Sequence, residues 1–374
     1  FFKVVYRRHT NFAMESIEQT INGTIKAGNR LTSTISRNGD LISNMYLEVD
    51  LPAGAYFKNS TGHTLIEYIE LEIGGQRIDK HYGEWLEVLS ELTLPEEKRQ
   101  GFKEMVGRRD AYIAGSSTLE SSKLFIPLQF FFCRNPGLAL PLIALQYHEV
   151  KINLKLRDWS DFAVADPGSN LDVKLYVDYV YLDTTERRRF AQMQHEYLIE
   201  QLQHTGPADA SEQTQRLNFN HPVKELVWIF RKDGAEKMNF SHTGGGSYVQ
   251  YGNVDTSVVD PFLATNSSDW FSTMKLQLNG HDRFSERDVR YFRLVQPFQH
   301  HTRVPSKHVY VYSFALNPEA HQPSGTCNFS RLDNVSMKFG YDVFPDSADE
   351  LLVYAVNYNV LRIMSGMGGL AYSN

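Results

Sequence analysis

Hydrophobic and polar residues alternate in short runs along much of this chain, a pattern typical of β-strands with one buried face. In the run 150–156 (VKINLKL) every second residue is apolar. Because successive side chains of a strand point to opposite faces of a sheet, this run predicts a strand with one face in a core and the other in water. Further runs rich in β-branched and aromatic residues predict strands at 30–37, 41–51, 124–126 and 171–182.

Two-residue turns separate several of these runs. The pairs 38–39 (NG), 74–75 (GG) and 279–280 (NG) each stand between apolar strand patterns. A type I′ turn needs positive φ at both central residues, and Gly and Asn adopt positive φ more readily than other residues do. The sequence therefore predicts a β-hairpin at each of the three positions.

Helical patterns are confined to short inserts between the strands. Apolar residues recur at helical spacing from 83 to 92, and a second helix, 96–105, is predicted directly after a proline. Two more short helices are predicted at 185–193 and at 285–295, the last of them ended by Pro297. Strands that outnumber helices, with helices only as inserts, are typical of antiparallel sandwiches.

The same order of landmarks occurs twice along the chain, which predicts a duplicated β domain. Each copy has a strand with a two-residue turn, an aromatic segment that ends in Asn-Pro and is expected to be a strand, an alternating strand, and a Tyr-rich strand. The first copy has these landmarks at 69–75, 130–136, 150–154 and 176–182, and the second copy at 274–280, 312–318, 335–339 and 354–361.

About eight strands per copy fit a jelly roll. We therefore expect an all-β fold, a double jelly roll made of two tandem eight-stranded antiparallel jelly rolls with short helical inserts, and domains at residues 1–190 and 191–374. Residues 233–269 break the rhythm, with three consecutive glycines and little periodicity. A segment of this length without a strand or helix pattern is expected to be an exposed excursion from the second copy.

The charge balance narrows the class of partners. The chain has a net charge of −6, which argues against direct nucleic-acid binding because such a surface needs a basic patch. No run approaches the roughly 18–20 apolar residues of a membrane-spanning helix. Cys133 and Cys327 are expected to be reduced thiols in two different cores. The chain begins at Phe1 without an initiator Met, so we expect a preceding segment.

Motifs for catalysis or cofactor binding are not recognisable. The sequence has no phosphate-binding glycine loop, no His-Glu-x-x-His, no Cys-x-x-Cys and no Gly-x-Ser-x-Gly. Two groups of polar residues are weak candidates for metal ions: His300-His301 for a metal, and Asp158, Asp161 and Asp166 for calcium, with a solvated loop as the simpler interpretation of the aspartates. The pair His148-Glu149 and the run 187–189 (RRR) are more simply surface groups. We expect no catalytic residue, no metal, no cofactor and no small-molecule substrate.

Six Asn-x-Ser/Thr triplets could in principle accept a glycan. They begin at Asn22, Asn59, Asn239, Asn266, Asn328 and Asn334. Asn239 and Asn266 fall within the long segment 233–269, where exposure is expected, so these two are the candidate glycosylation sites.

Five stretches of the chain resemble one family from end to end and in the family's order. They are 2–12 (FKVVYRRHTNF), 69–75 (IELEIGG), 140–150 (LPLIALQYHEV), 314–318 (FALNP) and 322–331 (QPSGTCNFSR). Each alone is only a strand and a turn, but five in order are specific. On these residues the chain resembles the major capsid proteins of the nucleocytoplasmic large DNA viruses, the group that includes iridoviruses, phycodnaviruses and mimivirus relatives.

The resemblance implies a structural protein of the virion, with two tandem jelly rolls per chain and homotrimers of pseudo-hexagonal outline that tile an icosahedral capsid. It implies neighbouring capsomers and minor capsid proteins as partners, an internal viral membrane as an indirect one, and synthesis and assembly in the host cytoplasm. Two other classes stay open from the residues alone. One is a carbohydrate-binding or adhesin-like double β-sandwich, which requires an exposed aromatic platform, and the other is a hydrolase, which requires polar residues that converge in one cleft.

Overall fold

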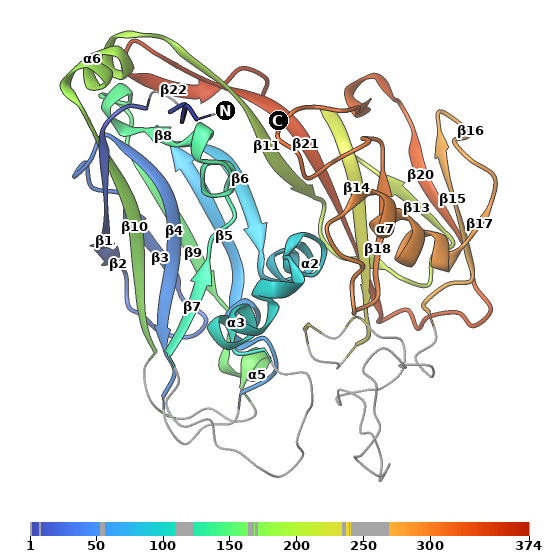
Figure 1. Cartoon of the computed structure of the whole chain (residues 1–374). Coiled ribbons are helices and arrows are strands. Elements are labelled where there is room, and N and C mark those ends of the chain that lie inside the picture. Colours follow the sequence, from blue (N-terminus) through green and yellow to red (C-terminus); the bar gives the residue numbers. More distant parts are fainter. Residues whose placement is uncertain are drawn as a thin grey trace.

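The strands form four sheets that pair into two β-barrels lying side by side (Figure 1). The computed structural model describes residues 2–6, 9–52, 57–108, 123–163, 168, 171–233, 237–238, 240 and 269–373. Neighbouring strands pair antiparallel throughout these residues, as they do in hairpin and Greek-key folds.

The first barrel consists of two sheets that face each other across a core. One sheet has the order β1-β10-β4-β7, and β8 also pairs with β4. The facing sheet has the order β2-β3-β9-β5-β6. The strands are β1 (Phe12–Gln19), β2 (Ile21–Asn22), β3 (Arg30–Thr34), β4 (Leu41–Asp50), β5 (Ile66–Ile73), β6 (Gln76–Tyr82), β7 (Lys123–Pro127), β8 (Leu140–Pro141), β9 (Val150–Leu156) and β10 (Asp172–Leu182).

The second barrel has the same plan. One sheet has the order β11-β21-β14-β18, with three short strands attached, and the facing sheet has the order β13-β20-β15-β16, with β17 paired to β15. The strands are β11 (His195–His204), β12 (Ala208–Asp209), β13 (Thr214–Leu217), β14 (Pro222–Arg231), β15 (Thr273–Leu278), β16 (His281–Asp282), β17 (Arg287–Asp288), β18 (Val309–Ser313), β19 (Cys327–Asn328), β20 (Val335–Gly340), β21 (Glu350–Met364) and β22 (Met367–Leu370).

The two barrels match strand for strand. In chain order, β1, β3, β4, β5, β6, β7, β9 and β10 correspond to β11, β13, β14, β15, β16, β18, β20 and β21, and the neighbours within each sheet are the same. Even the short strands β8 and β19 pair with corresponding partners, β4 and β14. The predicted duplication and the two eight-stranded jelly rolls are therefore confirmed.

Two of the three predicted hairpins are confirmed. Gly74 and Gly75 have φ of 57° and 84°, and Asn279 and Gly280 have φ of 51° and 82°, as a type I′ turn requires. The hairpin predicted at 38–39 is wrong, because β3 pairs with β9 whereas β4 pairs with β10 and β7. This segment carries the chain from one sheet to the other.

The helices lie between strands, as predicted. They include α1 (Thr61–Thr64), α2 (Gly83–Thr93), α3 (Glu96–Val106), α5 (Trp159–Phe162) and α6 (Thr184–Gln192). The helix predicted at 285–295 is displaced: β17 comes first, and a π-helical turn (Tyr291–Val295) then runs into α7 (Gln296–His300). Pro297 lies in the first turn of α7 instead of ending it, a position at which helices tolerate proline.

The aromatic segment 130–136 was expected to be a strand, but its centre is the short helix α4 (Phe131–Arg134). Phe130, Phe131 and Phe132 are all at most 3% exposed and pack in the first core. A strand would send alternate side chains to opposite faces, whereas a single helical turn points three consecutive rings into one core. The excursion expected at 233–269 lies mostly outside the described residues, and Met238 and Phe240 within it are buried.

Candidate functional site

Helix α2 joins the two barrels. It belongs to the connection between β6 and β7 of the first barrel, and it lies between the barrels in Figure 1. Its apolar side chains pack on the outward face of the second barrel's sheet and form a separate core, which we call the junction core. Its main members are Trp85, Val88, Leu89 and Leu92 of α2, Val227 and Ile229 of β14, Val309 and Val311 of β18, and Leu352, Tyr354 and Val356 of β21.

The junction core is well buried. Every one of its buried residues is at most 6% exposed, and burying a large apolar side chain contributes about 1.5–3 kcal/mol. The outward face of an antiparallel sheet usually meets water. Here that face is covered within the same chain, which holds the second barrel rigidly against the first.

The remaining side of α2 carries three buried glutamates, Glu84, Glu87 and Glu91. Their spacing of three and four residues places them on one face of the helix. Glu84 Oε1 lies 2.5 Å from Arg157 Nη2 of the first barrel and 2.6 Å from Arg231 Nη1 at the end of β14 in the second.

The other two glutamates also bind groups from both barrels. Glu87 lies 2.6 Å from His63 Nδ1 and 2.6 Å from Lys307 Nζ, which precedes β18. Glu91 contacts Arg108 of the first barrel, and its Oε2 accepts hydrogen bonds of 2.9 Å from both the backbone N–H and the hydroxyl of Ser306 in the second. We call these three glutamates and their partners the carboxylate ladder.

Burial and charge oppose each other in the carboxylate ladder. Burial alone would raise the pKa of Glu84, but Arg157 and Arg231 outweigh it and lower this pKa below its usual value. Burial would likewise raise the pKa of Glu87, but Lys307 and Arg108 outweigh this effect, and the pKa lies well below its usual value. The carboxylates are therefore ionised and paired, which is the condition under which buried charges are tolerated.

A second ionic group, the strand group, links the barrels through β11 and β14. Glu200 of β11 lies 2.7 Å from Arg134 Nη1 of the first barrel and 2.5 Å from Lys224 Nζ of β14. The next residue along β14, Glu225, lies 3.0 Å from His301 Nε2. Burial would lower the pKa of His301, but Glu225 and Glu319 raise it to about 9.

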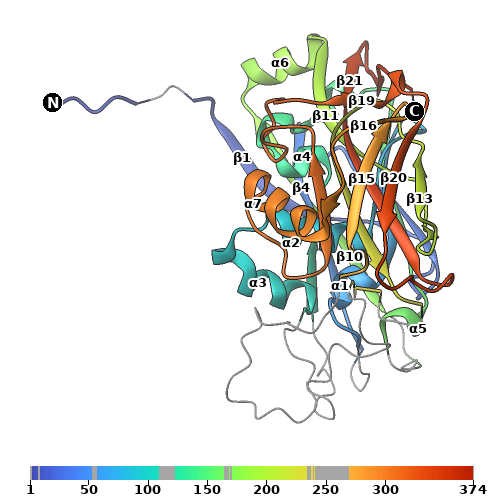
Figure 2. The same cartoon turned by 90° about the vertical axis from the view of Figure 1, so that its right-hand side faces the viewer.

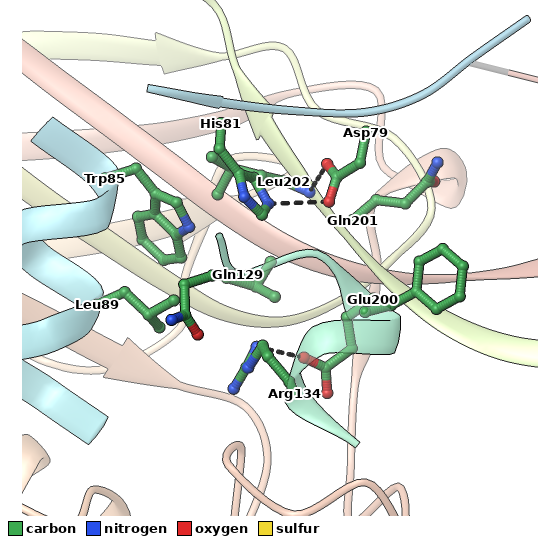
Figure 3. Close-up of a pocket in the computed structure, with 11 residues that line it drawn as sticks. Asp79, His81, Trp85, Leu89, Gln129, Arg134, Glu200, Gln201 and Leu202 are labelled. Carbon is green, nitrogen blue, oxygen red and sulfur yellow. Dashed lines mark hydrogen bonds and ion pairs between the residues drawn. The ribbon is translucent and has the colours of Figure 1, made fainter. Parts of the chain in front are cut away.

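A small cavity lies beside the strand group, with Arg134 and Glu200 in its lining together with Trp85 and Leu89 of α2 (Figure 3). Asp79 accepts from His81 Nε2 at 2.9 Å and from the N–H of Leu202 at 3.0 Å, so β6 of the first barrel is tied to β11 of the second. The cavity volume is about 20 Å³, which is room for about one water molecule. This cavity is therefore too small for a small-molecule substrate.

Two partly exposed apolar surfaces lie at other places on the two barrels. The first, the α7 patch, consists of Leu294, Val295, Phe298 and Leu316, which are 38%, 40%, 79% and 78% exposed. His300 Nδ1 lies 3.0 Å from the carbonyl oxygen of Leu316 and holds this residue beside α7.

The second surface, the aromatic row, lies on the outward face of the first barrel's sheet. It consists of Phe125 of β7, Tyr46 of β4 and Tyr176 of β10, all partly exposed. The rings of Tyr46 and Tyr176 stack with centroids 5.2 Å apart, and the Phe125 ring lies 6.3 Å from that of Tyr46. Exposed apolar patches of this kind mark contact surfaces more often than isolated exposed residues do.

The arm at residues 2–6 adds further exposed apolar side chains. It extends away from the body of the molecule (Figure 2). Phe2, Val4, Val5 and Tyr6 are each at least 69% exposed.

The polar groups that the sequence suggested have structural partners. His301 lies between two carboxylates, and the described residues contain no cluster of three or more His, Cys, Asp or Glu that could hold a metal ion. His148 Nδ1 lies 2.9 Å from the carbonyl oxygen of Gly368 in β22. Arg187 pairs with Asp40 at 2.9 Å, and Asp161 lies 3.8 Å from Lys237.

The remaining candidates divide between confirmed and untested. Cys133 and Cys327 are free and pack against different cores, as expected. Burial raises the pKa of Cys133 to about 12, which keeps it a thiol. Asn239, Asn266 and Asp166 lie outside the described residues.

The carboxylate ladder was not predicted, although the sequence contains a signal for it. In 83–93 (GEWLEVLSELT), the three glutamates share one face, large apolar residues occupy the opposite face, and the helix has no basic residue to pair with the glutamates. Glutamates on a helix that is buried need basic partners from other segments. Their identities could not be read from the sequence, because they come from distant segments.

Among the described residues, no helix combines the length and the apolar character that crossing a membrane requires.

Comparison with known proteins agrees with this architecture. Residues 186–369 match the family model described as large eukaryotic DNA virus major capsid protein, and residues 1–183 match the model described as major capsid protein N-terminus. The chain is 52% identical to the major capsid protein of Pyramimonas orientalis virus, with 100% of this chain and 94% of that protein covered. It is 42% identical to the major capsid protein of Phaeocystis pouchetii virus, with 100% and 95% covered.

A solved structure agrees as well. A chain of the quasi-atomic model of the PBCV-1 virus capsid is 41% identical and superposes with a TM-score of 0.84 over 100% of both chains. The two family models together span nearly the whole length, and one model begins where the other ends. The chain belongs to the family of large eukaryotic DNA virus major capsid proteins.

Proposed function

We propose that this chain is the structural subunit of an icosahedral virion shell and that three copies associate into one pseudo-hexagonal capsomer. The observation that carries the proposal is the repeated jelly roll, with the same strand order in two barrels held together by α2. Two similar barrels per chain convert three-fold rotation into a nearly six-fold outline, and six-sided units can cover a flat facet. A cyclic trimer uses heterologous contacts, so two different surfaces of the chain must be complementary.

We infer that the two jelly rolls occupy residues 1–190 and 191–374. In support, β10 ends at Leu182, α6 spans Thr184–Gln192 and β11 begins at His195. Helix α6 then acts as the connector, and the inferred boundary falls within it.

The other partners follow from membership of the family. We propose that neighbouring capsomers and minor capsid proteins contact this chain, that an internal viral membrane is an indirect partner, and that synthesis and assembly take place in the host cytoplasm. The net charge of −6 supports the absence of direct nucleic-acid contact. Glycosylation at Asn239 and Asn266 stays a prediction.

We also propose that the chain is not an enzyme and needs no cofactor or small-molecule substrate. The relatives named above are capsid proteins. The strongly perturbed glutamates and His301 belong to ion pairs that join the barrels, which is a structural reason for their pKa shifts. The alternative of a carbohydrate-binding or adhesin-like sandwich has no support among these relatives.

The test is the mass of the purified protein in solution. Light scattering after size-exclusion chromatography should give three times 42.9 kDa, and electron microscopy of particles should place the chain in the shell. A protein that stays monomeric at micromolar concentration would contradict the proposal.

A further inference from the structure

We infer that the contact between two subunits repeats the contact between the two barrels within one chain. The α7 patch of one copy covers the aromatic row of the next copy, as α2 covers the outward sheet face of the second barrel within one chain. This inference rests on the proposed trimer and names the two surfaces that form it.

The two helices occupy corresponding places in the duplicated fold. Helix α2 lies in the connection between β6 and β7, and α7 lies in the corresponding connection between β16 and β18. In the view along the line that joins the barrels, α7 lies in front of α2 on the same side of the molecule (Figure 2). A step that carries the first barrel onto the second therefore carries α2 towards the position of α7.

The α7 patch is a helix face that no segment among the described residues covers fully. Phe292 is fully buried in the second core, whereas Leu294, Val295 and Phe298 point outward. Phe298 follows Val295 by three residues and Leu294 by four, spacings that place its side chain beside both of them on a helical run. In α2 the corresponding apolar side chains are buried against the second barrel.

The receiving surfaces also correspond. In the second barrel, Val311, Val227 and Tyr354 form one cross-strand row on the outward face, beneath α2. In the first barrel the equivalent row joins Pro127, Tyr46 and Tyr176 across the equivalent strands. Both rows face away from their own barrel's core, but within the described part of the chain only the row of the second barrel is covered by a helix.

The face under α2 and the aromatic row differ in chemistry, and this fits the different stages at which they become covered. The face under α2 is mainly aliphatic, as suits a contact that forms during folding and never opens. The aromatic row carries tyrosine hydroxyls and lies beside the ion pair of Glu48 and Lys123 at 2.6 Å, so it can meet water before assembly. Tyrosine and phenylalanine are enriched at such interfaces because one side chain provides both apolar area and, in tyrosine, a polar end.

Repetition of the same contact from barrel to barrel also explains how three chains close into a ring. If each barrel contacts the next through the same element, three chains supply three contacts by α2 and three by α7. A heterologous contact that closes after a fixed number of steps forms a ring and leaves no free α7 patch.

Two substitutions test the two sides of the contact. Phe298→Asp on α7 and Tyr176→Asp on the aromatic row should each weaken trimer association by about thirtyfold or more, the factor for a hot-spot loss of about 2 kcal/mol. Val343→Asp is the matched control, since Val343 is 67% exposed and follows β20, a strand of the second barrel's other sheet. Circular dichroism and thermal unfolding of the variants show whether the monomers remain folded.

A photo-cross-linker identifies the partner surface directly and does not depend on a destabilising change. The photoreactive amino acid p-benzoylphenylalanine at position 298 should produce cross-linked dimers of the chain on a denaturing gel. Mass spectrometry should map the second site to peptides of β4, β7 or β10. The same label at position 343 should give no such product.

The outcomes separate this inference from the proposed trimer. A trimer that persists in Phe298→Asp, or cross-links that map to the arm at residues 2–6 or to other strands, overturns the inference and leaves the trimer standing. A wild-type protein that is monomeric overturns both.

Discussion

The carboxylate of Glu84, on the helix that the first barrel contributes, lies 2.6 Å from the guanidinium of Arg231, on the central strand of the second. Both side chains are buried, at 3% and 8% exposure. A charge pair between two barrels cannot form unless the barrels take one fixed position. We interpret this pair and its neighbours as the element that fixes the angle between the barrels, while the junction core supplies most of the apolar contact.

Removing the carboxylate of Glu84 should therefore lower the free energy of unfolding by more than the loss of its hydrogen bonds alone would. Glu84→Ala leaves Arg157 and Arg231 buried without their counter-charge, and breaking a buried pair from one side costs about 3–5 kcal/mol. Chemical denaturation should show this loss in the free energy of unfolding. Glu97→Ala on the exposed side of α3 is the control and should change it by about 0.5 kcal/mol or less. Equal losses in both variants would contradict a specific role for Glu84.

Acid should weaken the junction between the barrels. The folded protein holds the pKa values of Glu84, Glu87 and Glu91 below the ordinary 4.5. Such groups stabilise the fold above pH 4.5, and the stabilisation disappears as the pH falls through their lowered values. The denaturant concentration at the midpoint of unfolding should therefore decrease as the pH falls below 4.5. A midpoint that stays constant down to pH 3 would argue against ionised glutamates in the ladder.

Alkali should weaken the strand group through one residue. The pKa of His301 is raised from 6.5 to about 9, so its stabilisation is complete below pH 6.5 and is lost as the pH rises through about 9. The shift corresponds to about 3 kcal/mol. His301→Gln should be less stable at pH 6 but should lose less stability than the wild type between pH 6.5 and 9. Parallel profiles for the two proteins would contradict this assignment.

Glycine at the start of α2 should be irreplaceable. A Cβ at position 83 would lie 2.2 Å from the carbonyl oxygen of His63 and 2.4 Å from that of Ile66. Gly83→Ala must therefore push α2 away from the first barrel, and we expect a loss of several kcal/mol, about as large as for core overpacking. The matched change Gly101→Ala meets no atom within 4 Å on exposed α3 and should stabilise by about 0.5–1 kcal/mol. Similar thermal midpoints for the two variants would exclude this explanation.

Protein purified from virions should carry a glycan at Asn239 or Asn266. Its intact mass should exceed that of the polypeptide, and Asn239→Gln or Asn266→Gln should remove the excess. An intact mass equal to that of the unmodified chain would refute both sites.

Several elements could be predicted from sequence because local rules decide them. The turns at 74–75 and 279–280 need positive φ, so their Gly and Asn residues predict the hairpins without any knowledge of tertiary contacts. The strict alternation in 150–156 likewise predicts β9 and its buried apolar face, although Asn153 on the opposite face is buried as well. The turn at 38–39 shows the limit of such rules, because Gly39 is required there for a tertiary reason. Its Cβ would approach that of Tyr179 to 2.8 Å.

The sequence by itself determined the duplicated β architecture, since order, alternation and turn residues are properties of neighbouring positions. Only the tertiary structure decided that α2 would lie between the barrels and that Glu87 would meet His63 and Lys307, which are separated by more than 240 positions in the chain. The physical reason is that a buried charge selects its partner by position in three dimensions. Pairing of that kind leaves a trace in the sequence only as an unpartnered charge within an apolar helix.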